Sequence, residues 1–111
     1  MLRFLENHDT DRFLRDNPTD LDAYKQGLAL LLTIPGTPQL YYGQELLMHG
    51  TKSRPGGDGN IRLDVPGGWL GDTQNWFVRE GRSGLQNEAW DYLQNLLKWR
   101  KGNKIISEGS M

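Results

Sequence analysis

The chain has 111 residues, of which 36% are hydrophobic and 24% are charged, and its formal net charge is −1. This length leaves room for one domain with a modest core, and the near-neutral charge provides neither a basic stripe for nucleic acid nor an acidic tail. The sequence contains no cysteine, which excludes disulfides and thiolate metal sites, and no apolar run is long enough to cross a bilayer. We therefore expect no nucleic-acid partner and no membrane partner.

The N-terminal part of the chain predicts a strand followed by a helix. Residues 2–6 are mainly apolar and lead into a polar connection at 7–17. A helix is predicted over 20–33, with Thr19 as its N-cap and Asp22 in the capping-box position. Its apolar residues share one face, namely Leu21, Tyr24, Leu28 and Leu31.

A second strand is predicted directly after this helix. Pro35 and Gly36 end the helix, and residues 39–42 have the β-prone composition of a buried strand. The order strand, helix, strand is typical of a parallel βα unit, so the fold class is α/β. Residues 43–86 show no sustained period and are interpreted as a long functional loop, with a short helical turn at 72–78.

The C-terminal part of the chain predicts another amphipathic helix at about 87–101, with Gly102 as its stop. Its apolar face is expected to contain Trp90, Leu93 and Leu97. Residues 104–106 have the composition of the start of a further strand.

Three sequence blocks carry a family resemblance. They are Phe-Leu-Glu-Asn-His-Asp at 4–9, Pro-Gly-Thr-Pro-Gln-Leu-Tyr-Tyr-Gly-Gln-Glu at 35–45, and Arg-Leu-Asp-Val-Pro-Gly-Gly-Trp at 62–69. The chain resembles the alpha-amylase family of glycoside hydrolases, and the third block is similar to its cyclomaltodextrinase and neopullulanase branch.

This resemblance implies the C-terminal quarter of a (β/α)8 TIM barrel, consisting of strand 7, helix 7, strand 8, a long loop and helix 8. Residues 1–103 would be the βα units of the catalytic barrel, and residues 104–111 would begin a C-terminal β domain. The barrel is then incomplete as given, and its other six strands are expected to precede Met1.

The resemblance also implies site residues. Asp9 would be the third acid of a retaining glycosidase, accepting hydrogen bonds from sugar hydroxyls beside the reacting carbon, and His8 would donate to a hydroxyl of the same sugar. Asp58 and Arg62 would bind glucose units beyond the cleavage point. Without the motif, Asp9 would be interpreted as a turn cap, His8 as an ordinary core or surface histidine, and Asp58 with Arg62 as a solvated ion pair.

Further residues are assigned with alternatives. Trp69 and Trp76 are candidates for stacking on sugar rings, with packing of the long loop as the other interpretation. Asn7 is interpreted as a residue that orients the loop rather than a ligand contact. Arg12 is either a buried partner that holds the surroundings of Asp9 or an exposed charge. Five more residues are interpreted as scaffold, namely Tyr41, Tyr42, Glu45, Trp90 and Trp99.

The expected parent activity is hydrolysis, with retention, of α-1,4 glucosidic bonds, with α-1,6 bonds as an option, in cyclodextrins, pullulan or maltooligosaccharides. The partner is therefore an α-glucan oligosaccharide. The family's nucleophile motif Gly-x-Arg-x-Asp and its acid after strand 5 do not occur in this sequence, so the chain alone is expected to be inactive. The alternative is a non-catalytic module that binds glucan or completes a partner's barrel.

The remaining expectations concern assembly, metals and location. Unpaired strand edges and an incomplete core predict that the isolated chain self-associates. No cofactor or metal is expected in this segment, because two histidines and no cysteine make a metal site improbable, and calcium is a candidate only for the part of the enzyme outside it. The compartment is left open, with the periplasm or secretion slightly favoured over the cytoplasm.

Overall fold

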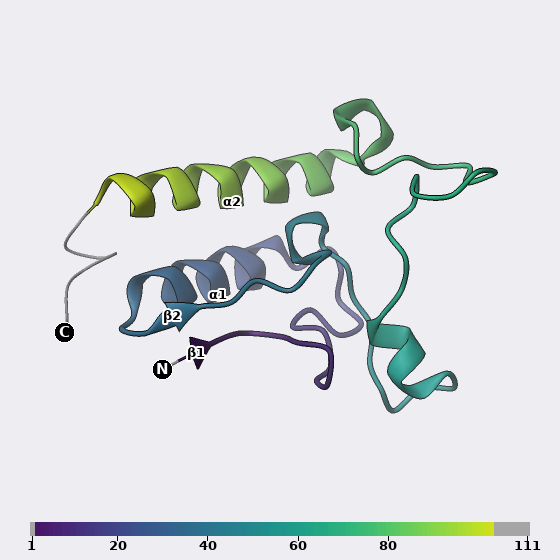
Figure 1. The fold of residues 1–111 in the computed structure, drawn as a ribbon, viewed down its shortest axis with the longest axis horizontal. Coiled ribbons are helices and arrows are strands. Elements are labelled where there is room, and N and C mark those ends of the chain that lie inside the picture. The colour runs from purple at the N-terminus through teal and green to yellow at the C-terminus, as the bar shows by residue number, and fades with distance from the viewer. Residues whose placement is uncertain (1, 104–111) are drawn as a thin grey trace.

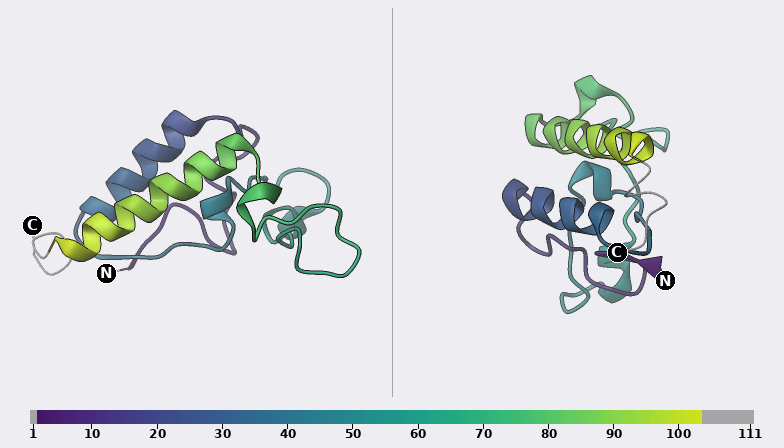
Figure 2. Two further views of the ribbon diagram at one scale, coloured as in Figure 1. Left: turned by 90° about the horizontal axis from the view of Figure 1, so that it is seen from above. Right: turned by 90° about the vertical axis from the view of Figure 1, so that its left-hand side faces the viewer.

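The computed structural model describes residues 2–103, in which two helices lie side by side and run in the same direction (Figures 1 and 2). The elements in chain order are β1 (Leu2–Arg3), α1 (Leu21–Thr33), β2 (Thr37–Pro38), three 3-10 turns at Gln44–Leu46, Gly57–Ile61 and Arg79–Gly81, and α2 (Gly84–Gly102). The strand predicted at 104–106 lies outside the described residues.

The two strands pair in parallel, so the predicted strand–helix–strand order is present. Leu2 lies opposite Thr37 and Arg3 opposite Pro38, and the Gln39 amide donates to the Arg3 carbonyl at 2.7 Å. Each strand has only two residues, so the first is shorter than the predicted 2–6, and the second lies just before the predicted 39–42, none of which is in a strand. Pro38 has no amide hydrogen to donate, which restricts the ladder. Leu2 in the first strand is 55% exposed.

Helix α1 begins one residue later than predicted and has a different N-cap. The carboxylate of Asp20, not the hydroxyl of Thr19, accepts a hydrogen bond from the Ala23 amide at 3.1 Å. Both residues have capping side chains, and only the backbone decides which one occupies the cap. The buried face of the helix consists of Tyr24, Leu28, Leu31 and Leu32.

Helix α2 begins three residues before its predicted start because of a capping box. The Ser83 hydroxyl accepts from the Gln86 amide at 3.1 Å, and the Gln86 side chain accepts from the Ser83 amide at 2.9 Å. This reciprocal pair satisfies two donors that a helix start would otherwise leave unpaired. The helix ends at Gly102, one residue beyond its predicted end, and Trp99 on its last turns is 47% exposed.

The hydrophobic core lies between the two helices. Its buried members are Leu14, Tyr24, Leu28, Leu32, Leu47, Ala89 and Leu93. The Tyr24 hydroxyl donates to the Ala89 carbonyl across this core at 3.4 Å. Gly27 lets the Phe13 ring approach α1, because a Cβ at that position would lie 2.8 Å from the ring. The connection at 7–17 is therefore packed against the helix that follows it.

The long loop is ordered by side chains rather than by a regular helix. The predicted turn at 72–78 is wrong, and the nearest helical turn is Arg79–Gly81. Asp72 and Asn75 instead accept hydrogen bonds from backbone amides of the loop, which competes with helix formation. Across residues 2–103, no helix has both the length and the apolar character that a membrane span requires.

Candidate functional site

The Asn-His-Asp motif forms a tight turn just beyond β1. The Asn7 side chain accepts from the Asp9 amide at 2.9 Å, and the Asn7 amide donates to the Thr10 hydroxyl at 3.0 Å. Asn7 is thus engaged with the backbone of its own turn, which leaves His8 and Asp9 to project from it. The side chains of His8 and Asp9 are both 67% exposed, and His8 Nε2 lies 3.2 Å from Asp9 Oδ2.

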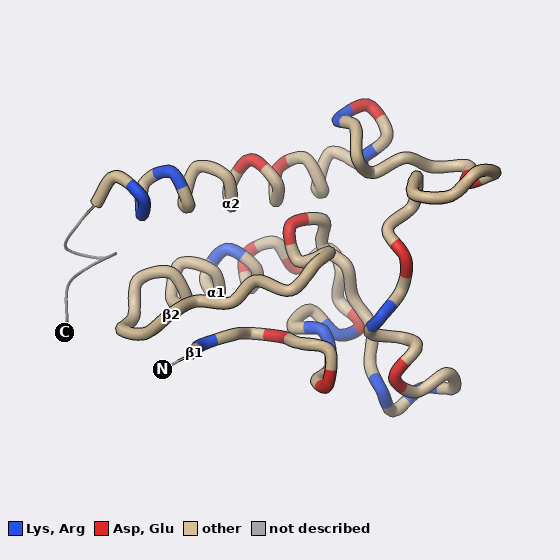
Figure 3. The backbone as a smooth tube through the Cα atoms, viewed as in Figure 1, with Lys and Arg blue, Asp and Glu red and all other residues tan. Residues whose placement is uncertain are grey.

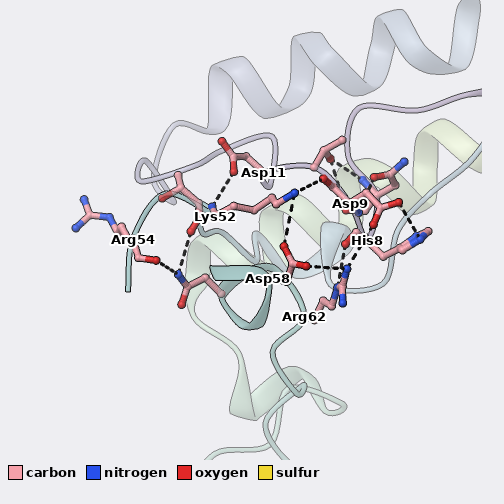
Figure 4. Close-up of polar contacts among 11 residues, drawn as sticks. His8, Asp9, Asp11, Lys52, Arg54, Asp58 and Arg62 are labelled. Carbon is pink, nitrogen blue, oxygen red and sulfur yellow. Dashed lines mark hydrogen bonds and ion pairs between the residues drawn. The ribbon is translucent and has the colours of Figure 1, made fainter. Parts of the chain in front are cut away.

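Arg62 joins this turn to the loop that follows the second strand (Figure 4). Its Nη2 lies 3.4 Å from Asp9 Oδ1 and 3.4 Å from Asp58 Oδ2, and its Nε donates to the His8 carbonyl at 2.9 Å. Arg62 and Asp9 are separated by 53 positions in the sequence. The structure therefore brings together the four residues to which the family resemblance assigned a sugar contact, namely His8, Asp9, Asp58 and Arg62.

Lys52 is a fifth member of this network that the sequence did not single out. Its Nζ donates to the Asp9 carbonyl at 3.0 Å and lies 3.5 Å from Asp58 Oδ1. Its backbone amide donates to Asp11 Oδ1 at 2.8 Å. No motif contains this lysine, and only the fold reveals its place. Charged residues lie at intervals along the turn after β1 and along the loop before α2 (Figure 3).

Two tyrosines that follow the second strand hold the loop that carries Arg62. The Tyr41 hydroxyl donates to the Ile61 carbonyl at 3.2 Å, and the Tyr42 hydroxyl donates to the Leu63 carbonyl at 2.7 Å. These two carbonyls flank Arg62 in the chain. Desolvation and the neighbouring Tyr41 raise the pKa of the Tyr42 hydroxyl above its ordinary value.

A buried ion pair lies beneath the exposed network. Arg12 is 0% exposed, and its Nη1 lies 3.2 Å from Glu6 Oε1 and donates to the Tyr42 carbonyl at 2.6 Å. The other Glu6 oxygen accepts from the Phe13 amide at 2.7 Å. The guanidinium carbon also lies 4.1 Å from the centre of the Tyr41 ring. Of the two interpretations of Arg12, the buried one describes the structure.

Glu6 is under opposing electrostatic influences. Burial raises the pKa of the Glu6 carboxyl above its ordinary value, while the Phe13 amide and the Arg12 guanidinium oppose that shift. The pair joins the segment just before the Asn-His-Asp turn to the connection after it, six residues later. Both ends of the turn are therefore anchored, although its tip is exposed.

Trp69 and Trp76 do not join this network. Trp69 is 67% exposed, and its indole nitrogen donates to Asp64 Oδ2 at 3.0 Å. Trp76 is partly buried, and its carbonyl accepts from Arg82. Both lie in the loop that extends away from the helices (Figure 1). Among the described residues, no group of three or more histidine, aspartate or glutamate side chains is arranged to hold a metal ion.

Comparison with known proteins identifies relatives that cover nearly the whole chain. It is 44% identical over 110 residues to the cyclomaltodextrin glucanotransferase of Thermoanaerobacterium thermosulfurigenes, and 33% identical over 107 residues to that of Bacillus sp. (strain 38-2). It is also 31% identical over 106 residues to the maltogenic alpha-amylase of Bacillus acidopullulyticus. These matches cover 99%, 96% and 95% of this chain. Its homologues are enzymes of the alpha-amylase family.

The same comparisons limit how far this relationship extends. The chain spans only 12% of the length of the two glucanotransferases and 15% of the length of the maltogenic amylase. The chain matches no protein-family model. The homology supports a glycosidase parent, whereas the cyclomaltodextrinase and neopullulanase branch stays a prediction.

Proposed function

We propose that this chain forms one side of the substrate site of a retaining alpha-amylase-family glycosidase that cleaves α-1,4 glucosidic bonds in an α-glucan. The observation that carries the proposal is the meeting of His8, Asp9, Asp58 and Arg62 on one surface. These residues come from two loops that are far apart in the sequence. The homologues of the chain are glucan-active enzymes. A family motif and a spatial cluster thus point to the same residues.

Asp9 acts in this proposal as an acceptor for sugar hydroxyls. Its carboxylate is exposed and ion-paired with Arg62, which suits hydrogen-bond acceptance better than protonation of a leaving group. Hydrogen bonds to hydroxyls that strengthen as the ring acquires oxocarbenium character lower the barrier, because they favour the transition state over the ground state. His8, 3.2 Å from Asp9, donates to a neighbouring hydroxyl of the same sugar.

Asp58 and Arg62 act on the next part of the glucan. Asp58 lies between two cations, Lys52 and Arg62, at 3.5 Å and 3.4 Å. All three side chains are partly exposed, so each has room to exchange a protein contact for a sugar hydroxyl. This arrangement fits a subsite for glucose units beyond the cleavage point, in a maltooligosaccharide, a cyclodextrin or pullulan.

The nucleophile and the general acid belong to other parts of the enzyme in this proposal. A retaining glycosidase needs two carboxyl groups that flank the scissile bond, and the family motifs for both are missing from this sequence. The parallel β1–α1–β2 order supports our proposal that residues 1–103 are the last βα units of a (β/α)8 barrel. The polar turn after β1 would then lie at the end of the barrel where catalytic residues gather.

We also propose that the isolated chain associates with itself. Leu2 and Phe4 are exposed beside an unpaired strand edge, and Leu40 with Trp90 and Leu97 lines an open apolar groove of about 300 Å³. Analytical ultracentrifugation of the purified chain should show a dimer or larger species. A single monomeric species at micromolar concentrations would refute this assignment.

The decisive experiment replaces Asp9 by asparagine in the enzyme that carries this chain. Loss of a charge-assisted bond made in the transition state should lower kcat/KM on maltoheptaose by about a hundredfold or more. Asp16→Asn is the matched control, because Asp16 is an exposed carboxylate paired with Arg54 outside the network. It should leave kcat/KM unchanged.

The outcomes separate catalysis from a binding module. If Asp9→Asn weakens glucan binding but leaves kcat at the wild-type value, the chain is a non-catalytic binding element and the catalytic role of Asp9 fails. The isolated 111-residue chain should release no reducing sugar from maltoheptaose. Hydrolysis by that chain, abolished by Asp9→Asn, would show that it holds the whole catalytic apparatus.

A further inference from the structure

The loop between the substrate network and α2 has a folded structure of its own. Asp72 Oδ2 accepts from the amides of Gly67 at 2.8 Å and Trp69 at 3.1 Å, and the Trp76 amide donates to the Pro66 carbonyl at 2.9 Å. Gly67 has a φ of +105° and would place a Cβ 2.4 Å from the Asn75 side chain, so only glycine fits there. The loop is closed on itself by these contacts and presents a defined surface.

One hydrogen bond fixes the Trp69 ring at its indole nitrogen, and most of the ring surface is exposed to solvent. Its indole nitrogen donates to Asp64 Oδ2 at 3.0 Å, while 67% of the residue remains exposed. Leaving so large an aromatic surface in water sacrifices the stabilisation that burial would give. A hydrogen bond that fixes the ring in this exposed position is expected where the ring serves as a contact surface for a ligand.

The surface beside Trp69 has the chemistry that recognises a sugar. A hollow of about 260 Å³ is lined by Asp64, Pro66, Trp69, Asp72, Thr73 and Gln74. The indole offers an apolar face, and the carboxylates, the hydroxyl and the amide offer hydrogen-bond partners around it. A pyranose ring has the complementary pattern, with an apolar face and hydroxyls at its edge. In the described chain, Oδ1 of Asp64 and Oδ1 of Asp72 make no hydrogen bond.

We propose that this hollow is a second glucan subsite, in which Trp69 stacks on a glucose unit and Asp64 and Asp72 accept hydrogen bonds from its hydroxyls. The ligand's identity rests on the proposed function, whereas the site is separate from the His8–Asp9–Arg62 network. Arg62 is separated by one residue from Asp64, the first residue that lines the hollow. The Tyr42 hydroxyl donates to the carbonyl of the intervening Leu63. One loop thus carries contacts for two parts of a glucan chain.

The test measures glucan binding by the enzyme that carries this chain, in an Asp9→Asn background so that the ligand is not consumed. Isothermal titration with maltoheptaose compares Trp69→Ala with Trp99→Ala, which removes an exposed tryptophan on α2 that lies outside the hollow. Trp69→Ala should raise Kd about tenfold, the effect of losing one aromatic contact, and Trp99→Ala should leave Kd unchanged. Equal Kd values for the two variants would overturn the proposal.

A second measurement reports on the site itself and guards against misfolding. In a ¹H–¹⁵N spectrum, the Trp69 indole resonance, assigned by its loss in Trp69→Phe, should shift on addition of maltose. Asp72→Asn keeps the shape of that side chain and should weaken binding less than Trp69→Ala. No shift at saturating maltose, with the Trp69→Phe variant folded by circular dichroism, would refute the subsite.

The two proposals fail in different ways. If Asp9→Asn abolishes turnover while Trp69→Ala binds maltoheptaose with wild-type affinity, the proposed function stands and the second subsite is wrong. If Asp9→Asn leaves turnover unchanged while Trp69→Ala still weakens binding, the hollow is a glucan site and the catalytic role is wrong. In active enzyme, Trp69→Ala should raise KM for long maltooligosaccharides more than for maltotriose.

Discussion

Replacing Arg12 by methionine should destabilise the fold by about 3–5 kcal/mol. The guanidinium is fully buried and lies 3.2 Å from Glu6 Oε1, so its removal leaves a buried carboxylate with only the Phe13 amide as partner. The variant also loses the hydrogen bond to the Tyr42 carbonyl and the contact with the Tyr41 ring. Domains are stable by only about 5–15 kcal/mol, so this is a large share of the total.

Urea denaturation followed by circular dichroism measures the effect. The control is Arg54→Met, which removes an arginine whose 3.0 Å pair with Asp16 is exposed and should leave stability nearly unchanged. The slope of the free energy of unfolding against urea should be the same in both variants, which shows that only stability has changed. If Arg12→Met costs no more than Arg54→Met, the buried pair does not hold the fold.

A double variant separates the loss of the pair from the cost of an isolated charge. Glu6→Gln with Arg12→Met removes both charges and should be more stable than Arg12→Met alone, because no unpaired carboxylate remains in the core. Within residues 2–103, Arg12 Nε has no hydrogen-bond partner, which already weakens the pair. A double variant that is less stable than Arg12→Met would contradict this explanation.

The remaining predictions concern caps, core and pH, and are checked by the same titration. Asp20→Ala should cost about 1 kcal/mol, whereas Thr19→Ala should change stability by less than about 0.5 kcal/mol, since Asp20 is the observed cap. Leu28→Ala should cost about 2–5 kcal/mol, and the exposed Leu30→Ala should have little effect. Burial raises the pKa of the Glu6 carboxyl above its ordinary value of 4.5. The contribution of this carboxyl to the free energy of unfolding is therefore fully present below pH 4.5 and is lost as the pH rises through the raised pKa. Glu6→Gln should remove this part of the pH dependence.

The helices were predictable because local patterns define them. The apolar spacing that places Tyr24 and Leu28 on one face identified α1 to within one residue. The start of α2 was missed because the prediction followed apolar positions, although the Ser83–Gln86 capping box was readable from the sequence. The strand lengths were not predictable in the same way, since β-prone composition does not show whether a neighbouring strand is present to extend the ladder.

The candidate site divides along similar lines. Sequence motifs singled out His8, Asp9, Asp58 and Arg62, and the structure places these residues together, while their roles stay proposals. Lys52 was missed because its importance comes from spatial contacts with a turn 43 positions away. The burial of Arg12 was left open because an arginine in a polar connection is usually exposed, and only its pairing with a buried carboxylate reverses that expectation.

The contrast between the two charge networks explains how the turn can be both positioned and adaptable. The Glu6–Arg12 pair is buried and costly to break, so it holds the backbone on both sides of the turn in place. The contacts of Asp9 with His8 and Arg62 are exposed, and pairs of this kind contribute only about 0–1 kcal/mol each. In the proposed function, a sugar hydroxyl replaces one of these contacts at small energetic cost, while the backbone of the turn stays in place. The proposed glucan site would gain from this division between a rigid base and exchangeable contacts.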